Sequence, residues 1–334
     1  MYGILLFSII LYSELIKLRL MRKKQFTIYA NNYINSLQEE GRYATAHVYK
    51  NALRSFSDFC GTRSISFRLV NRENLKRYSN YLVLMQLKPN TISTYMRMLR
   101  CIYNRGVDAH QAPYVHGLFR DVFTGVDTRQ KKALPLNELH ILLNKDPGTE
   151  KLRRTQAIAN LLFQFSGMPF VDFAHLEKSN LSQGLLMYNR RKTGIPMSVE
   201  VLDSAKEQIS RLLNTNSAEQ PDYPDYLFHI LSGEYKRNEE GAYREYQSAL
   251  RCFNNHLKCL SRKLNLSSPV TSYSLRHSWA TTAKYRGVPI EMISESLGHK
   301  SIKTTQIYLK GFELTERTKV NKLNYSYVKS FRAL

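Results

Sequence analysis

Residues 271–278 read Thr-Ser-Tyr-Ser-Leu-Arg-His-Ser, residues 297–299 read Leu-Gly-His, and a tyrosine stands at 308. The surrounding pattern predicts three short helices: 273–286, 290–297 and 302–310. Arg276, His299 and Tyr308 therefore stand at or near three successive helices. Each residue alone indicates little, because a chain with 22 tyrosines and 9 histidines contains many chance pairs. Their combination at this spacing is much more specific than any one of them.

The charge balance of the chain predicts a polyanionic partner. The 334 residues include 49 Lys and Arg against 27 Asp and Glu, which gives a formal net charge of +22 and a pI near 9.8. Such an excess is typical of proteins that bind nucleic acid. It is present in both halves of the chain, which argues against one basic tail on a neutral enzyme. A hydrophobic content of 43% is enough for real cores, and the length predicts about two domains.

The N-terminal part of the chain predicts a small helical domain over residues 21–106. Apolar residues recur at helical spacing through 25–106, and the last of four helices is expected to end near Gly106. The other face of that helix carries three arginines that we interpret as a surface for phosphate-backbone contacts, Arg97, Arg100 and Arg105. Residues 107–135 lack periodicity and contain several Pro and Gly residues. They are predicted to be a linker.

The second part of the chain, residues 136–334, predicts a larger α+β domain with a C-terminal tail. Helical patterns cover 136–144, 152–165 and 243–263. Two strand-like runs, Leu185–Arg190 and Ile195–Val201, flank Arg191-Lys192-Thr193-Gly194, which is a hairpin signature with glycine at the turn. The predicted fold is therefore mainly α with one small β-sheet.

On the residues of 271–308 the chain resembles the tyrosine recombinases, also called the phage integrase family, over about residues 25–320. The resemblance implies a helical core-binding domain and a larger catalytic domain that together clamp duplex DNA at specific sites. It further implies phosphoryl transfer through a 3′-phosphotyrosyl link, without metal, ATP or another cofactor. In this resemblance Tyr308 matches the nucleophile, Arg276 a clamp for the non-bridging oxygens, His299 a hydrogen-bond donor, and Lys192 the acid for the leaving 5′-oxygen.

Two alternatives accompany these roles. Arg190 and Arg191 adjoin Lys192, so this basic turn is also interpretable as nothing more than a DNA phosphate contact. The first histidine of the family's His-x-x-Arg is Tyr273 here, three residues before Arg276. Tyrosine keeps a hydroxyl donor but not the titration range of imidazole near neutral pH.

Besides Tyr273, the chain departs from the family pattern at the family's first clamp arginine. In the family it lies in a Gly-x-Arg-x-x-Glu element, and the matching stretch here is Gly-Met-Pro-Phe-Val-Asp at 167–172. Asp172 stands where the acid that braces this arginine belongs, but Pro169 occupies the arginine position. In the branch of the family with the Gly-Met-Pro-Phe-Val-Asp signature an arginine precedes the glycine, and here that residue is Ser166. Loss of one such donor costs about 2.7–4 kcal/mol of transition-state stabilisation.

The sequence therefore supports two functional hypotheses. The first is a site-specific DNA recombinase, of integrase or invertase type, that acts through Tyr308, with another arginine in place of the missing one. Three replacements were considered: Arg153, Arg154 and Arg191. The second hypothesis is a DNA-binding relative with impaired catalysis or none.

The expected partners and location follow from the same resemblance. We expect double-stranded DNA as partner, four copies on two duplexes, and a cytoplasmic, nucleoid-associated protein. Residues 311–334 are interpretable either as a helix exchanged between copies or as a tail packed on its own domain. No Cys-x-x-Cys or His-x-His pair occurs, so nothing predicts a metal site.

The first residues require a separate interpretation. The apolar run at 1–12 is shorter than the about 20 residues that span a bilayer, and its basic residues follow it rather than precede it, unlike a signal peptide. We expect no stable membrane association. Our hypothesis is that Met21 is the start and that residues 1–20 are an N-terminal extension; a short membrane-surface helix is the alternative.

Overall fold

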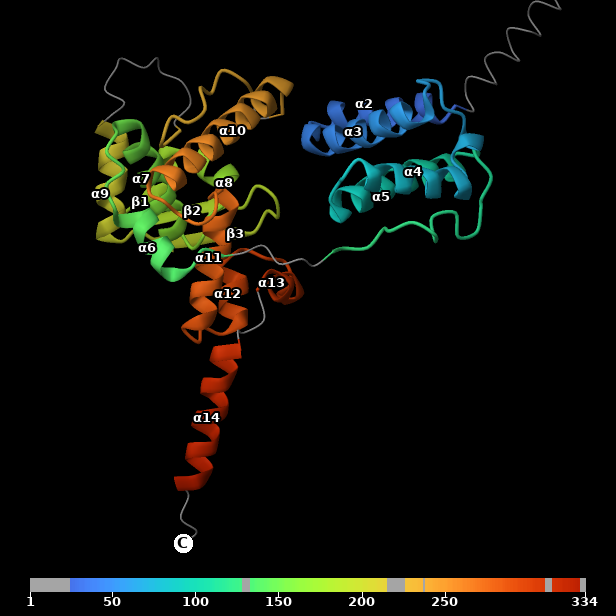
Figure 1. Cartoon of the computed structure of the whole chain (residues 1–334). Coiled ribbons are helices and arrows are strands. Elements are labelled where there is room, and N and C mark those ends of the chain that lie inside the picture. Colours follow the sequence, from blue (N-terminus) through green and yellow to red (C-terminus); the bar gives the residue numbers. More distant parts are fainter. Residues whose placement is uncertain (1–24, 128–132, 215–225, 237, 310–313, 331–334) are drawn as a thin grey trace, which may run out of the picture. The chain divides into compact units, whose positions relative to one another are not determined.

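The computed structural model describes residues 25–127, 133–214, 226–236, 238–309 and 314–330 (Figure 1). The described residues up to Asp127 form one compact unit, and most of those from Ala133 onward form the other. The expected extension at 1–20 and part of the expected linker, 128–132, lie outside the described residues.

The first unit is built from four helices: α2 (Phe26–Glu39), α3 (Tyr43–Cys60), α4 (Arg72–Leu84) and α5 (Pro89–Asp108). Local chemistry sets several of their ends. The Asn71 side chain accepts a hydrogen bond from the backbone N–H of Asn74 at the start of α4, as preferred N-cap residues do. Pro89 opens α5, and Gly61 ends α3 in the left-handed conformation with φ of +64°, which glycine adopts without strain. All four helices bury their apolar sides in one core.

Helix α5 ends near Gly106, as expected: its last residue is Asp108, so Gly106 itself lies inside the final turn. A Cβ at Gly106 would lie 2.5 Å from the Phe67 ring, so this glycine allows the ring to pack against the helix. Leu118 and Phe119, from the segment expected to be a linker, are buried in the same core. The first part of that segment therefore packs on the first unit.

The second unit is mainly helical. Its described helices are α6 (Leu136–Asn144), α7 (Glu150–Gln164), α8 (Phe170–Ala174), α9 (Asp203–Asn214), α10 (Glu240–Lys263), α11 (Ser272–Tyr285), α12 (Ile290–Ser296), α13 (Ile302–Tyr308) and α14 (Leu314–Ser330). Its strands form one antiparallel sheet in the order β1 (Leu181–Ser182), β2 (Leu185–Asn189) and β3 (Pro196–Glu200). The prediction of a mainly α fold with a small β-sheet is confirmed. Strand β1 and helices α8 and α9 were not predicted.

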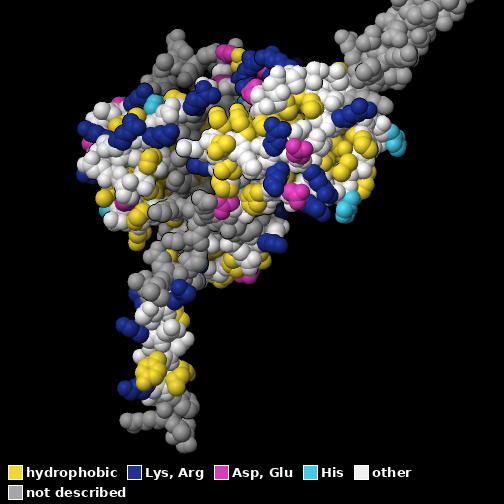
Figure 2. Space-filling view, turned by 45° about the vertical axis from the view of Figure 1, so that its right-hand side comes forward, with side chains coloured by type: hydrophobic (Ala, Val, Ile, Leu, Met, Phe, Trp, Pro, Cys, Tyr) yellow, Lys and Arg dark blue, Asp and Glu magenta, His cyan; other side chains and the backbone are white. Residues whose placement is uncertain are grey.

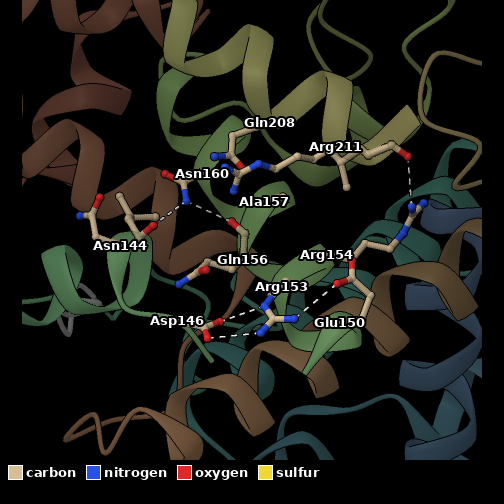
Figure 3. Close-up of a pocket in the computed structure, with 12 residues that line it drawn as sticks. Asn144, Asp146, Glu150, Arg153, Arg154, Gln156, Ala157, Asn160, Gln208 and Arg211 are labelled. Atoms are coloured by element: carbon tan, nitrogen blue, oxygen red, sulfur yellow. Dashed lines mark hydrogen bonds and ion pairs between the residues drawn. The ribbon is translucent and has the colours of Figure 1, made fainter. Parts of the chain in front are cut away.

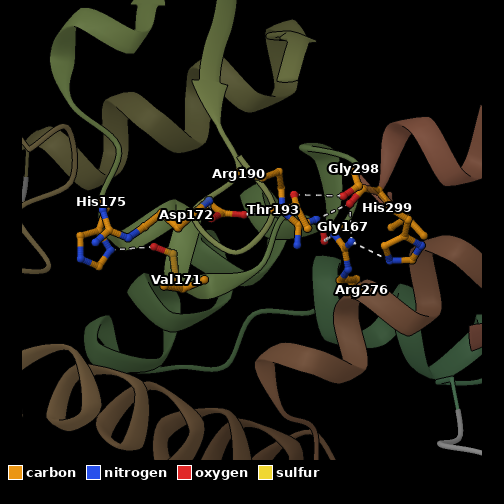
Figure 4. A network of polar contacts seen from close by, with 11 residues as sticks. Gly167, Val171, Asp172, His175, Arg190, Thr193, Arg276, Gly298 and His299 are labelled. Atoms are coloured by element: carbon orange, nitrogen blue, oxygen red, sulfur yellow. Dashed lines mark hydrogen bonds and ion pairs between the residues drawn. The ribbon is translucent and has the colours of Figure 1, made fainter. Parts of the chain in front are cut away.

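The short helix α8 is held in place by aromatic stacking on both sides. Phe170 stacks on Phe253 of α10 with ring centroids 4.6 Å apart, and Phe173 stacks on Phe228 at 4.4 Å. Asp172 lies between these two anchors in the chain, and its side chain is directed toward the β2–β3 hairpin (Figure 4). Because the anchors are large rings within the main core of the unit, the position of this carboxylate is determined by packing rather than by α8 itself.

Helix α14 leaves apolar side chains exposed to solvent. Val320, Leu323, Tyr325, Tyr327 and Val328 are each between 54% and 74% exposed, and some of this apolar surface is visible on the helix in Figure 2. Within the described part of the chain, no helix combines the length and apolar character needed to cross a bilayer.

Candidate functional site

Arg276 is the centre of a buried polar cluster in the second unit. It lies on α11, whose start is capped by the Thr271 side chain, and only 3% of its surface is exposed. Its Nη1 donates to the carbonyl of Gly167 at 2.9 Å, and its Nη2 donates to the carbonyl of Leu297. A Cβ at Gly167 would lie 3.1 Å from Arg276 Cα. Glycine at this position therefore lets the loop after α7 approach α11 closely.

A second buried arginine, Arg190, reaches the same carbonyl from the opposite side. It follows strand β2, is 6% exposed, and donates through Nη1 to the Leu297 carbonyl. Its Nε lies 2.9 Å from Oδ2 of Asp172, and Oδ1 of Asp172 accepts the backbone N–H of Arg191 at 2.9 Å. We expected Arg190 and Arg191 to contact DNA phosphates as part of a basic turn. The Arg190 side chain is buried instead, because it pairs with the Asp172 carboxylate and donates to the Leu297 carbonyl.

The two guanidinium groups therefore converge on one oxygen atom (Figure 4). The glycine of Leu-Gly-His makes this possible. Gly298 has φ of +61°, and a Cβ there would lie 2.9 Å from Cγ of Arg190. Any other residue would displace the Arg190 stem. The Leu-Gly-His motif thus places both the shared carbonyl and the histidine beside the arginine pair.

The electrostatics of Asp172 are set by opposing effects. Burial raises the pKa of its carboxyl above the usual range, while the Arg191 N–H, Arg190 and Arg276 favour the ionised form and oppose that rise. The ion pair with Arg190 at 2.9 Å uses the ionised carboxylate. Such a pair is costly to break once formed, because either partner alone would be a buried charge.

His299 completes the cluster as a neutral imidazole. Its Nε2 lies 3.2 Å from Nη2 of Arg276, and its Nδ1 lies 2.9 Å from Oγ1 of Thr305 on α13. Burial, followed by the charges of Arg276, Arg190 and Lys192, lowers the pKa of His299 to about 4. A cation is disfavoured where three other cations surround a desolvated ring.

This lowered pKa predicts how His299 titrates. Its resonances in a histidine-labelled NMR sample are expected to shift with a midpoint near pH 4, well below the usual 6.5 of imidazole. Because the folded pKa is below the unfolded one, the site favours folding above about pH 6.5, and this contribution is lost as the pH falls toward 4. A His299→Gln variant identifies the resonance. A midpoint near 6.5 for that resonance would contradict the burial and the arginine contacts.

Comparison with known proteins places the chain in a family. A sequence model of the phage integrase SAM-like domain matches residues 25–114, and a model of the phage integrase family matches residues 134–313, more than half of the chain. The chain belongs to the phage integrase family.

Individual relatives agree with this assignment. The chain is 25% identical over 301 residues to the probable integrase/recombinase protein MJ0367 of Methanocaldococcus jannaschii, covering 85% of this chain and 87% of that protein. It is 25% identical over 273 residues to the tyrosine recombinase XerA of Pyrococcus horikoshii, covering 72% and 90%. The narrower branch with the Gly-Met-Pro-Phe-Val-Asp signature stays a prediction.

Solved structures show the same fold. A lambda integrase dimer bound to a COC′ core site matches with a TM-score of 0.62 at 14% identity, covering 90% of this chain and 83% of that chain. The Tn1549 transposon integrase in complex with a circular intermediate DNA matches with a TM-score of 0.63 at 15% identity, covering 88% and 99%.

Three further residues of this integrase-family chain were predicted for the site: Lys192, Tyr273 and Tyr308. Lys192 is exposed at the turn of the hairpin and contributes to the electrostatic field at His299. Tyr273 is 44% exposed, and its ring packs edge-on against His277 at 4.9 Å. Tyr308 ends α13, and its side chain lies outside the described residues.

Two of the arginines considered as replacements for the missing one make contacts with residues outside the Arg276 cluster. Arg153 pairs with Asp146 at 2.9 Å and with Glu150 at 3.7 Å, and Arg154 donates to the Leu212 carbonyl at 3.3 Å. Figure 3 shows these residues around a cavity of about 670 Å³ lined by α6, α7 and α9. The sequence contained one signal for a replacement: Asp172 keeps the place of the acid that braces the family's first arginine, so a nearby arginine such as Arg190 was needed to pair with it.

The arginines predicted to contact DNA in the first unit lie on α5. Arg97 and Arg100 are half-buried, with side-chain contacts to Thr94 at 3.3 Å and Thr124 at 3.4 Å. Arg105 is exposed, and its guanidinium lies 4.2 Å from the Tyr33 ring centroid. Lys and Arg side chains are widely spread over the surface in view in Figure 2. The role of Arg97, Arg100 and Arg105 in DNA contact stays a prediction.

Proposed function

We propose that the chain is a catalytically competent site-specific recombinase that cleaves and rejoins DNA through Tyr308, and that Arg190 takes the place of the missing clamp arginine. The observation that carries this proposal is the pair of buried guanidinium groups, from Arg190 and Arg276, that meet at the Leu297 carbonyl. Two neighbouring guanidinium groups suit a phosphate clamp, since arginine is a permanently charged, planar donor that matches phosphate oxygens.

The proposed reaction transfers one phosphoryl bond at a time. The Tyr308 hydroxyl loses its proton to solvent and attacks the scissile phosphorus, a 3′-phosphotyrosyl bond forms, and the bond to the 5′-oxygen breaks. Lys192 donates a proton to that 5′-oxygen. Attack by a 5′-hydroxyl of a second duplex reverses these steps and rejoins the strands. The arginine pair and His299 stabilise charge on the non-bridging oxygens.

The burial of both arginines implies an exchange of partners on DNA binding. With exposed fractions of 3% and 6%, the guanidinium groups are satisfied internally in the DNA-free chain. A phosphate oxygen carries a full negative charge and forms stronger hydrogen bonds with arginine than a neutral carbonyl does. The phosphate is therefore expected to replace the Leu297 carbonyl as the common acceptor.

Double-stranded DNA and an oligomeric assembly are the proposed partners. The net charge of +22 suits a polyanion, and the lambda and Tn1549 integrases are DNA complexes in their solved structures. The exposed apolar residues of α14 are consistent with a helix that packs on another copy.

The alternative, a DNA-binding relative without catalysis, is favoured by Ser166 and Pro169, which leave no arginine at the family's usual position. The Arg190–Asp172 pair argues against it, because the acid of that element still holds an arginine.

The deciding experiment is a search for a covalent adduct. The purified protein is incubated with DNA from both sides of its own gene, and denaturing gels are used to detect a protein–DNA band. We expect the wild type to form the adduct and Tyr308→Phe to bind DNA without forming it. DNA binding without an adduct in the wild type, combined with an adduct in Ser166→Arg, would support the non-catalytic alternative instead.

A further inference from the structure

Thr305 has a buried hydroxyl at an unusual place in the fold. It lies on α13, three residues before Tyr308, and is completely buried, whereas its neighbour Thr304 is exposed. Buried hydroxyl groups nearly always have a hydrogen-bond partner, and Oγ1 of Thr305 lies 2.9 Å from Nδ1 of His299. The helix that carries the proposed nucleophile is thus joined to the histidine of the arginine cluster.

The partners of His299 determine which of its nitrogens carries the proton. Arginine only donates hydrogen bonds, so Nε2, 3.2 Å from Nη2 of Arg276, is the acceptor in that contact. In a neutral imidazole the proton is then on Nδ1, and Thr305 Oγ1 accepts it. In this state Nε2 has no proton to donate to a phosphate.

We propose that Thr305 is a positioning residue that orients His299 and supports both of its neutral tautomers. With Arg276 on Nε2, the Thr305 hydroxyl accepts from Nδ1–H. When a phosphate draws Arg276 away, the same hydroxyl turns and donates to Nδ1, so that Nε2–H donates to a non-bridging phosphate oxygen. This inference rests on the proposed function and adds how the orientation and protonation of His299 are controlled at that site.

The exchange of tautomers conserves protons. Nδ1 releases one proton to solvent water and Nε2 takes one from water, so the imidazole stays neutral throughout. A hydroxyl group suits this role because it is both a donor and an acceptor. Among the described residues, Arg276 from α11 and Arg190 and Lys192 from the hairpin act on the ring by charge, and all three favour its neutral form.

The inference also links the nucleophile helix to the clamp. Helix α13 has only seven residues, and the Thr305–His299 contact joins it to the arginine cluster. When α13 is displaced, His299 loses the partner that orients its ring. His299 is therefore expected to be oriented for a hydrogen bond to phosphate only while α13 keeps its contact with the histidine.

Three variants test this inference. Thr305→Val keeps the shape of the side chain but removes the hydroxyl, Thr305→Ser keeps the hydroxyl, and Thr304→Val is a matched control on the exposed side of α13. The first readout is the Nδ1–H proton of His299 in the DNA-free protein: NMR with imidazole-¹⁵N histidine measures the tautomer and the rate at which this proton exchanges with solvent. The second is the rate of adduct formation at saturating DNA, with DNA affinity measured separately.

All four proteins are expected to show the Nδ1–H tautomer, because Arg276 donates to Nε2 in each of them. The Nδ1–H proton is expected to exchange slowly with solvent in the wild type, Thr305→Ser and Thr304→Val, and faster in Thr305→Val, which lacks its acceptor. The adduct rate of Thr305→Val is expected to fall on the order of 10–100-fold, by analogy with groups that orient metal-ligating histidines, with DNA affinity unchanged. Equally slow exchange of the Nδ1–H proton in Thr305→Val and the wild type would overturn the inference, whatever the DNA assays give. No adduct from any protein, wild type included, would overturn the proposed function and is distinguished by the NMR result.

Discussion

Replacement of Arg190 by glutamine is expected to lower the rate of covalent adduct formation about 100–1000-fold. Loss of one preorganised donor to the transition state costs about 2.7–4 kcal/mol in comparable sites, and each 1.36 kcal/mol is tenfold in rate. Arg190→Lys is expected to restore little activity, since an ammonium group lacks the planar fork that holds both Asp172 and an oxygen. The measurement is the single-turnover rate of adduct formation on DNA that the wild type cleaves.

Two further proteins separate loss of the clamp from loss of the fold. Arg153→Gln removes an exposed arginine that pairs with Asp146 outside the cluster, and it is expected to react at the wild-type rate. Adding Ser166→Arg to Arg190→Gln places an arginine next to Gly167, and part of the rate is expected to return. If Arg190→Gln reacts as fast as the wild type, or if Arg153→Gln is the slow variant, the assignment of Arg190 is wrong.

Removal of the Asp172 carboxylate is expected to destabilise the second unit by about 3–5 kcal/mol. The side chain of Asp172 is fully buried and that of its partner Arg190 is only 6% exposed, so Asp172→Ala leaves a buried guanidinium without its counter-charge. Asp172→Asn keeps an acceptor for the Arg191 N–H but loses the charge, and it is expected to lie between the wild type and Asp172→Ala.

The single tryptophan of the chain makes this measurable. Trp279 lies on α11 next to the cluster, so its fluorescence in a denaturant titration reports on the second unit alone. The matched control is Asp203→Ala, which breaks an exposed ion pair with Lys206; its unfolding midpoint is expected to stay at the wild-type value. Equal midpoints for Asp172→Ala and the wild type would mean that the ion pair does not hold the hairpin.

Patterns that span a few residues were readable from the sequence. The basic excess, the apolar stripes of helices such as α3 and α10, and the β2–β3 hairpin depend on local spacing and turn chemistry. The Arg276, His299 and Tyr308 combination was readable for the same reason, because it lies within 271–308. The chain's place in the phage integrase family follows from these patterns and is confirmed by the family comparison.

Other features depend on which side chains meet after folding. Asp172 and Arg190 are 18 positions apart, and they meet after folding, when the stacking of Phe170 and Phe173 holds α8 in the core beside the hairpin. Likewise, the sequence placed a helix end near Gly106 but did not show that the Phe67 ring packs against this glycine, where a Cβ would lie 2.5 Å from it.

The sequence by itself therefore determined the family, the helical organisation and the residues near which phosphate chemistry is expected. Only the tertiary structure decided which arginine stands beside Arg276 and which hydroxyl holds His299. The physical reason is that local spacing encodes helices and turns, whereas a buried charge pairs with the counter-charge that packing of the core brings within about 3 Å. That partner is chosen by the whole core, and no short stretch of sequence contains it.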